Sequence, residues 1–295
     1  MNPPEELWRG LIDDAAMFPP GNASAGQAVA AHREHRHAWY ADLIGPLVVP
    51  DQALRQAQGA WGEAMGAELV EVREEALRPA RGQLDVSVIN TGGAGGLLAL
   101  AGRAIEGVHV IAVESALRDL DDLAGNAARV AAAAGELDES VKVFVEIPYA
   151  AGWEEAVAEV EAAGLLGKIR TGSPDNSGTP PYAQLAGQLS VLVEADLPFK
   201  ATAGLHHAQP TPGSNPEQPV QHGFLNLLAA VEALIEGATA ADAEEMLRAA
   251  DVARVAAWSD ETVARVRRRF PSFGCCGVLD PVGDLVTLGL VEEPS

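Results

Sequence analysis

The chain has 295 residues, of which 48% are hydrophobic and 21% charged, and its formal net charge at pH 7 is −22. This composition is typical of a soluble globular protein, and the acidic balance argues against partners that need a basic surface, namely nucleic acids and anionic membranes. The sequence contains no apolar run of the roughly 18 residues that span a bilayer, and its N-terminus lacks the features of a signal peptide. We therefore expect a cytoplasmic protein with a small-molecule substrate. The oligomeric state stays open, a homo-oligomer included.

Short apolar runs alternate with helix-like segments along almost the whole chain. The strands expected in chain order are residues 11–13, 47–49, 84–89, 108–113, 141–145, 167–170, 198–202 and 253–257. The helices expected around them are residues 25–38, 51–65, 95–105, 117–135, 152–164, 181–194, 222–236 and 260–269, the last with Ser259 as its cap. Near-continuous apolar strands separated by helices are typical of a parallel sheet covered on both faces.

About eight strand–helix units in a chain of this length predict a single (β/α)8 TIM barrel over residues 1–295. An open, doubly wound sheet is the alternative, because a sequence does not show whether a sheet closes. Residues 270–295 are expected to form a C-terminal extension that wraps around the barrel. The proline-rich residues 209–221 follow a strand's carboxyl end, where the lids of barrels lie.

Lysine is scarce in this chain. Of its 20 lysines and arginines only three are lysine, and two of these stand in short apolar runs before a glycine. Lys168 opens Lys-Ile-Arg-Thr-Gly and Lys200 opens Lys-Ala-Thr-Ala-Gly, whereas Lys142 has no such setting. Side chains alternate along a strand, so Lys168 shares a face with Arg170, and Lys200 with Thr202.

Two lysines on neighbouring strands are expected to lower each other's pKa from the usual value of about 10.4. A neutral lysine amine condenses with an aldehyde or ketone to an iminium, which acts as an electron sink when a carbon–carbon bond is made or broken. We therefore expect one of the two amines to be uncharged near neutrality. The alternative is a purely structural ion pair between these lysines and Glu146.

Polar residues near strand carboxyl ends are expected to meet at one mouth of the barrel. Glu146 and Asp13 are the candidates for proton transfer, with a loop histidine as an alternative, and Arg170 is the candidate for reading an anionic group of the substrate. The other expected substrate-binding residues are Glu114, Thr171, Gly172, Thr202, Gly204, His206 and His207.

Four segments of the chain resemble motifs of the deoxyribose-phosphate aldolases and their class I aldolase relatives. They are residues 11–19 around Asp13, residues 143–146 ending in Glu146, residues 168–172 and residues 200–204. The resemblance implies a Schiff base on Lys168, a tuning role for Lys200, and a lyase that uses no cofactor or metal.

The chain departs from this family at two places. Where the family's fourth strand carries an aspartate for proton transfer, the corresponding position is His109, with Glu114 further along. Where the family has a glycine- and serine-rich phosphate grip after the eighth strand, we expect residues 257–261, Ala-Trp-Ser-Asp-Glu. An acidic, bulky turn is a poor phosphate cradle, so a phosphorylated sugar is not the expected substrate.

Two other functions stay open. One is a metal-dependent barrel lyase, isomerase or hydrolase that uses Glu114, Glu146 and histidines, with His222 added to the tandem pair at 206–207. The other is a non-catalytic barrel that binds an anionic metabolite. Cys275 and Cys276 are expected to be small residues packed in a turn, because they form no Cys-x-x-Cys motif.

Overall fold

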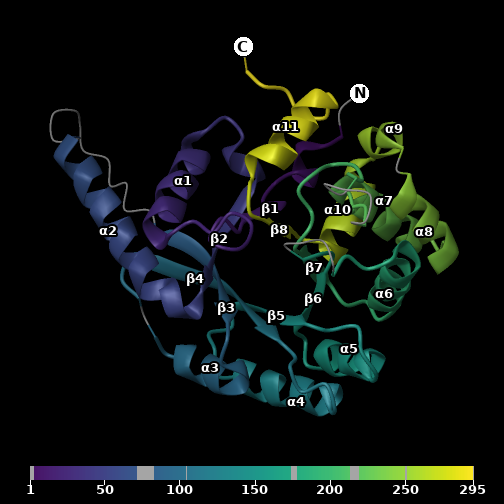
Figure 1. Ribbon diagram of the computed structural model, residues 1–295, viewed down its shortest axis with the longest axis horizontal. Helices are drawn as coiled ribbons and strands as arrows, with labels where there is room; N and C mark the ends of the chain where they lie inside the picture. The colour runs from purple at the N-terminus through teal and green to yellow at the C-terminus, as the bar shows by residue number, and fades with distance from the viewer. Residues whose placement is uncertain are drawn as a thin grey trace.

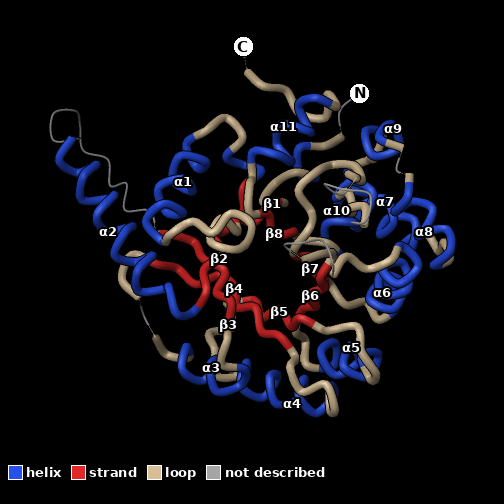
Figure 2. The backbone as a smooth tube through the Cα atoms, viewed as in Figure 1, coloured by secondary structure: helices blue, strands red, loops and turns tan. Residues whose placement is uncertain are grey.

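The computed structural model describes residues 3–71, 83–103, 105–173, 178–212, 219–249 and 251–294. These residues form eight parallel strands that close into a barrel in chain order, the last pairing with the first. Figure 2 shows the strands at the centre of the molecule and the helices outside them. The predicted (β/α)8 barrel is thereby confirmed. The strands are β1 (Ile12–Asp14), β2 (Ile44–Pro50), β3 (Leu84–Asn90), β4 (Val108–Ala116), β5 (Lys142–Glu146), β6 (Leu166–Arg170), β7 (Phe199–Thr202) and β8 (Phe273–Cys275).

The helices surround this barrel, as Figure 1 shows. Several begin at a side-chain cap: Ser24 and Thr239 form capping boxes, and Ser259 accepts a hydrogen bond from the amide of Thr262, as expected for its helix. None of the described helices combines the length and the apolar character that a membrane span requires. The helices are α1 (Ala25–His37), α2 (Leu54–Glu71), α3 (Gly93–Leu100), α4 (Leu123–Ala134), α5 (Trp153–Ala162), α6 (Tyr182–Glu194), α7 (Phe224–Ile235), α8 (Ala240–Arg248), α9 (Val252–Ala256), α10 (Asp260–Arg269) and α11 (Leu279–Thr287).

The eighth strand is not where the sequence pattern placed it. Residues 253–257, expected as a strand, belong mostly to α9, whose N-cap Asp251 accepts a hydrogen bond from the amide of Ala253. A short run of alanine and valine fits a buried strand and one face of a short helix equally well, so periodicity does not separate them. The true β8 is only three residues long and has glycine at its centre, which makes it resemble a turn in the sequence.

This correction changes the role of the C-terminal residues. The segment expected to be an outer wrap supplies β8, which closes the barrel by pairing with β1 and β7. It also supplies α11, whose Asp284 accepts hydrogen bonds from the backbone amide of Ala208 and contacts His207 Nδ1 at 3.1 Å. Residues 257–261 lie at the start of α10 and do not follow the last strand. The sequence argument against a phosphorylated substrate therefore loses its basis.

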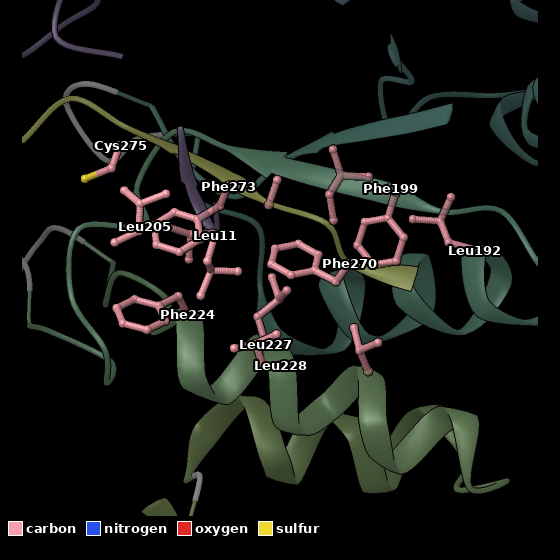
Figure 3. Close-up of a cluster of buried hydrophobic side chains, with 14 of the residues drawn as sticks. Leu11, Leu192, Phe199, Leu205, Phe224, Leu227, Leu228, Phe270, Phe273 and Cys275 are labelled. Carbon is pink, nitrogen blue, oxygen red and sulfur yellow. The ribbon is translucent and has the colours of Figure 1, made fainter. Parts of the chain in front are cut away.

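The outer faces of β7 and β8 pack against aromatic side chains from the start of α7 and from the residue that follows α10, shown in Figure 3. Phe273 stacks on Phe224 with ring centroids 5.0 Å apart, and Phe199 meets Phe270 edge-on at 5.5 Å. Aromatic pairs of this kind contribute about 0.5–1.5 kcal/mol beyond their buried area. Because Phe199 and Ala201 face this layer, strand alternation turns Lys200 and Thr202 into the barrel.

Candidate functional site

The interior of the barrel is divided between two cavities with a cluster of charged side chains between them. One cavity, of about 240 Å³, opens at the carboxyl ends of the strands and is lined by Glu146, Lys168 and Arg170 among others. The other, of about 620 Å³, opens at the amino ends and is lined by Asp13 and residues that begin β3 and β5. Lys200 lines both cavities and thus lies between them.

Glu114 is at the centre of the cluster. Its Oε2 is 2.7 Å from Nζ of Lys168 and its Oε1 is 2.7 Å from Nζ of Lys200, so one carboxylate bridges both amines. The hydroxyl of Ser87 donates a further hydrogen bond of 2.7 Å to Oε1. The register of the sheet accounts for this arrangement, because Lys168 is directly opposite Lys200 on adjacent strands.

Each amine has a second carboxylate as well. Lys168 lies 3.0 Å from Oε2 of Glu146, and Lys200 donates a short hydrogen bond to Asp13. Asp13 also accepts a hydrogen bond of 2.8 Å from the hydroxyl of Ser272. The cluster therefore holds two ammonium groups and three carboxylates. Because four of its five side chains are at most 5% exposed and Glu146 is 17% exposed, Glu146 is the member most open to solvent.

The charges of the two lysines differ from the expectation. Burial acts against the charge of Lys168, but the carboxylates of Glu114 and Glu146 outweigh burial, and the pKa of this amine is raised. Burial opposes the charge of Lys200 in the same way, and Asp13 with Glu114 raises the pKa of that amine too. The prediction that one amine is neutral near pH 7 is thus wrong for the resting protein. Mutual repulsion of the lysines does act on Lys168, but the carboxylates of Glu114 and Glu146 outweigh it.

The carboxylates respond differently to the same surroundings. Glu114 is fully buried, yet two ammonium groups in contact with it lower its pKa far below the usual range. Burial raises the pKa of Asp13, with Lys200 and Ser272 only partly offsetting the loss of solvent. Of these two groups, Asp13 is therefore the one that accepts a proton more readily.

The carboxyl-terminal cavity brings together most of the residues predicted from strand ends. Its lining includes four members of the cluster, namely Glu114, Glu146, Lys168 and Lys200. Arg170 also lines it, with Nη1 3.6 Å from Oε1 of Glu146. The rim contains the predicted Thr202, Gly204 and His206.

Four predicted residues lie elsewhere. Asp13 faces the amino-terminal cavity, and its side chain is not part of the lining of the carboxyl-terminal one, where it was expected. Thr171 donates its hydroxyl hydrogen bond to the backbone carbonyl of Ala203 at 2.6 Å. Gly172 packs against the backbone of Gly204, and His207 contacts Asp284 on α11. These three contacts are structural.

The fourth strand needs a further correction. His109 lies near the start of β4, and its Nδ1 pairs with Asp85 at 2.9 Å in an exposed position. Glu114, five residues later, occupies the interior position between the lysines. Of these two residues, Glu114 is therefore the one that reaches the cluster, while His109 lies toward the amino end of the strand.

Sequence reasoning missed several residues of this site. Ser87 and Ser272 fix the orientation of the buried carboxylates, but no pattern distinguishes an inward-facing serine from any other serine in a strand. Arg118 lines the carboxyl-terminal cavity just beyond β4, and its place after a predicted strand was a usable signal. Cys276 also lines this cavity and lies 3.6 Å from Nδ1 of His206, at the end of the strand that was not predicted.

The histidines and cysteines do not assemble a metal site with the glutamates. His206 contacts the two thiols, and burial lowers the pKa of its imidazole and raises the pKa of Cys276. His222 lies outside the cluster, and its Nε2 is 2.8 Å from the backbone carbonyl oxygen of Pro180. Within the described ranges, no group of three or more His, Cys, Asp or Glu side chains is arranged to hold a metal ion.

Comparison of the chain with protein-family models, with curated proteins and with solved structures finds no match. What is established is therefore the fold and the geometry of the site: a (β/α)8 barrel whose interior contains a buried cluster of two lysines and three carboxylates.

Proposed function

We propose that the protein is a carbon–carbon lyase of the class I aldolase type, similar in mechanism to the deoxyribose-phosphate aldolases, with Lys168 as the Schiff-base nucleophile. The observation that carries this proposal is the position of Lys168. Its amine is buried against Glu114 but lies on the wall of the carboxyl-terminal cavity, the end of a TIM barrel where active sites lie. Glu146, Lys200 and Arg170 line the same cavity.

The first step is loss of a proton from Lys168. Glu146 is 3.0 Å from the amine and is the most exposed carboxylate of the cluster, so it takes this proton and passes it to solvent through the mouth. Lys200 assists, because its positive charge lowers the pKa of Lys168 while the carboxylates raise it. Each pKa unit above the working pH costs about 1.4 kcal/mol.

The neutral amine then attacks the carbonyl carbon of the substrate. A bond forms between Nζ and that carbon, and the carbonyl oxygen takes one proton from the amine and a second from solvent through Glu146, so that it leaves as water and an iminium results. In a β-hydroxy carbonyl substrate, Glu146 removes the hydroxyl proton while the bond between the α and β carbons breaks. The electron pair of the broken carbon–carbon bond moves to the iminium to give an enamine, and the fragment that contains the β carbon is released as an aldehyde. Protonation of the enamine carbon and hydrolysis return the lysine and the second carbonyl product.

The cavity sets limits on the substrate. A volume of about 240 Å³ lies below the usual range of ligand pockets and suits a small carbonyl compound. Arg170 is half-exposed at the edge of this cavity and Arg118 lines it too, so two guanidiniums are available for an anionic group of the substrate. The substrate class proposed is accordingly a small, anionic β-hydroxy aldehyde or ketone.

Borohydride trapping tests the proposal. The protein is incubated with acetaldehyde, propanal or pyruvate and then with sodium borohydride, which reduces an iminium to a stable secondary amine that peptide mass spectrometry locates. With only three lysines in the chain, assignment is direct. We expect the adduct on buried Lys168 in preference to exposed Lys142.

Two variants supply the controls. Lys168→Arg keeps the charge beside Glu114 but removes the nucleophilic amine, so trapping is expected to disappear. Lys142→Arg changes a lysine outside the cluster and is expected to trap like the parent. An adduct on Lys200 would exchange the roles of the two lysines, and labelling of Lys142 alone would refute the proposal.

One observation favours a second function. Each amine of the cluster already has two carboxylate partners, which is how a purely structural ionic core is built. The second candidate is therefore a non-catalytic barrel that binds a small anionic metabolite at the carboxyl-terminal mouth through Arg118 and Arg170. Saturable binding of such a metabolite, with no trapped adduct from any of the three carbonyl compounds, would decide for this function.

A further inference from the structure

The amino-terminal end of the barrel is hollow because its inward side chains are small. In a TIM barrel, layers of bulky branched side chains usually fill the interior. Here the positions that line the amino-terminal cavity include Gly45, Ser87, Ala112 and Ser272. A Cβ atom at Gly45 would collide with Oδ1 of Asp13, so alanine at that position would require this carboxylate to shift. The result is a cavity of about 620 Å³, well within the range of ligand pockets.

The walls of this cavity are largely apolar. The apolar lining includes the side chains of Ile44, Trp61 and Leu84. Phe144 also lines the cavity, and the centroid of its ring is 5.2 Å from Nζ of Lys200. The acidic groups in the wall are already paired: Asp13 with Lys200, and Asp85 with His109. An apolar surface of this kind accommodates the hydrocarbon part of a ligand.

The rim of the same cavity is cationic, although the protein as a whole has a net charge of −22. Arg36, Lys142 and Arg267 line it, together with Arg9. Arg9 pairs with Glu6, but none of the other three forms an ion pair with a carboxylate among the residues that the structure describes.

Arg267 is the most significant of these cations. It extends from the last turn of α10, and its guanidinium donates hydrogen bonds to the backbone carbonyls of Arg9 and Phe270 at 2.7 and 3.2 Å. These neutral acceptors fix its position without balancing its charge. Burial lowers the pKa of Arg267 to about 10, despite the opposing effects of Asp13 and Glu6. A positive charge held at a half-buried cavity wall without a counter-ion favours a bound anion.

We propose that the amino-terminal cavity is a second binding site, for a small organic carboxylate whose hydrocarbon part lies in the cavity and whose carboxylate contacts Arg267, with Arg36 nearby. Size, apolar walls and unbalanced cations at the rim all agree with this ligand class. The inference does not depend on the chemistry of Lys168, which lines the other cavity.

Calorimetric titration of the full chain with matched probes tests the proposal. Hexanoate and benzoate carry the proposed combination of charge and apolar body, hexanol and benzyl alcohol lack the charge, and inorganic phosphate lacks the apolar body. We expect saturable binding of the carboxylates, at least about tenfold tighter than binding of the alcohols, because a charge-assisted hydrogen bond is lost in the alcohols. Equal binding of the alcohols, tighter binding of phosphate, or binding of none of the probes would each overturn the proposal.

Variants locate the site. Arg267→Gln is expected to weaken hexanoate binding about tenfold or more. Arg36→Gln, which alters an exposed side chain, gives a smaller loss in the same direction and keeps the test valid if the first variant is poorly folded by circular dichroism. Arg118 and Lys168 line the opposite cavity. The variants Arg118→Gln and Lys168→Arg are therefore expected to bind hexanoate with an affinity within twofold of the parent. Loss of binding in these two variants, with binding retained in Arg267→Gln, would refute the assignment.

Discussion

The two mouths of the barrel are lined by different kinds of side chain, although the same strands run through both. At the carboxyl-terminal mouth the inward residues are long and charged, and each ammonium group contacts two carboxylates of the cluster. At the amino-terminal mouth they are small or apolar, and of the cations at the rim Arg36, Lys142 and Arg267 have no carboxylate partner among the described residues. Alternation along single strands produces both: on β5, Lys142, Phe144 and Glu146 run from one mouth to the other.

The same buried cluster of two lysines and three carboxylates, here called the ionic layer, therefore forms part of the wall of both cavities. Lys168 and Glu146 present the layer to the smaller cavity, and Asp13 and Lys200 present it to the larger one. Glu114 connects the two halves through contacts of 2.7 Å on either side. Changes at Glu114 should therefore affect the whole layer, whereas changes at either mouth should remain local.

The largest expected effect is on stability. Glu114→Gln removes the charge shared by both amines and leaves two buried ammonium groups with less compensation. Breaking a buried ion pair by removing one partner costs about 3–5 kcal/mol, so we expect a loss of that size in the free energy of unfolding. Urea denaturation at pH 7 measures it, with exposed Glu154→Gln as the matched control. A loss below about 1 kcal/mol, as is usual for surface pairs, would show that the two halves are not connected through this carboxylate.

The next effect concerns the dependence of trapping on pH. Because the pKa of Lys168 is raised, its neutral fraction below that pKa increases tenfold for each pH unit. The rate of borohydride-trapped adduct formation should accordingly rise about a hundredfold between pH 7 and pH 9.

Glu146→Gln sharpens this test. Removing a carboxylate that raises the pKa of Lys168 lowers that pKa, so at equal pH the variant should have a larger neutral fraction, and its rate should level off at a lower pH. Rates measured at fixed aldehyde concentration in both proteins check the prediction. A rate that does not change with pH in the parent would mean that the amine is not the group whose deprotonation limits the reaction.

A third comparison tests whether the amino-terminal end is hollow. Ala112→Leu adds volume into the amino-terminal cavity and should cost less than about 1.5 kcal/mol, as tolerated changes do. Ala201→Leu adds the same volume on the packed outer face of β7 and should cost about 1–3 kcal/mol. Urea midpoints of the two variants give the comparison directly. Equal costs would argue that the amino-terminal end is as tightly packed as the outer layer.

The smallest effect is expected at Ser272. Ser272→Ala removes one hydrogen bond to Asp13, which is worth about 1 kcal/mol. Since this hydroxyl lowers the pKa of Asp13, its loss should raise that pKa further. The free energy of unfolding, followed from pH 7 to pH 4, reports the change, and trapping at Lys168 should be unaffected. A large loss of trapping would contradict the expectation that a change at the amino-terminal mouth leaves Lys168 unaffected.

The sequence by itself determined the alternation of strands and helices and the principal candidate residues of the site. Apolar runs of strand length separated by helical segments predicted seven of the strands, and residue alternation predicted that Lys168 and Lys200 face the same interior. Both signals are local, since they depend on periods of two and of about 3.6 residues along the chain. Where the local signal is ambiguous it failed: Phe273–Cys275 is too short, and residues 253–257 fit a helix equally well.

Only the tertiary structure decided which charges meet. The carboxylates of Asp13, Glu114 and Glu146 come from β1, β4 and β5, and nothing in their sequence spacing indicates that they surround two amines from β6 and β7. Barrel closure brings them within hydrogen-bond distance, and the resulting balance of charge and burial keeps the lysines protonated where the sequence alone suggested a neutral amine. A pKa depends on distances through space and on loss of solvent, and closure of the barrel sets both.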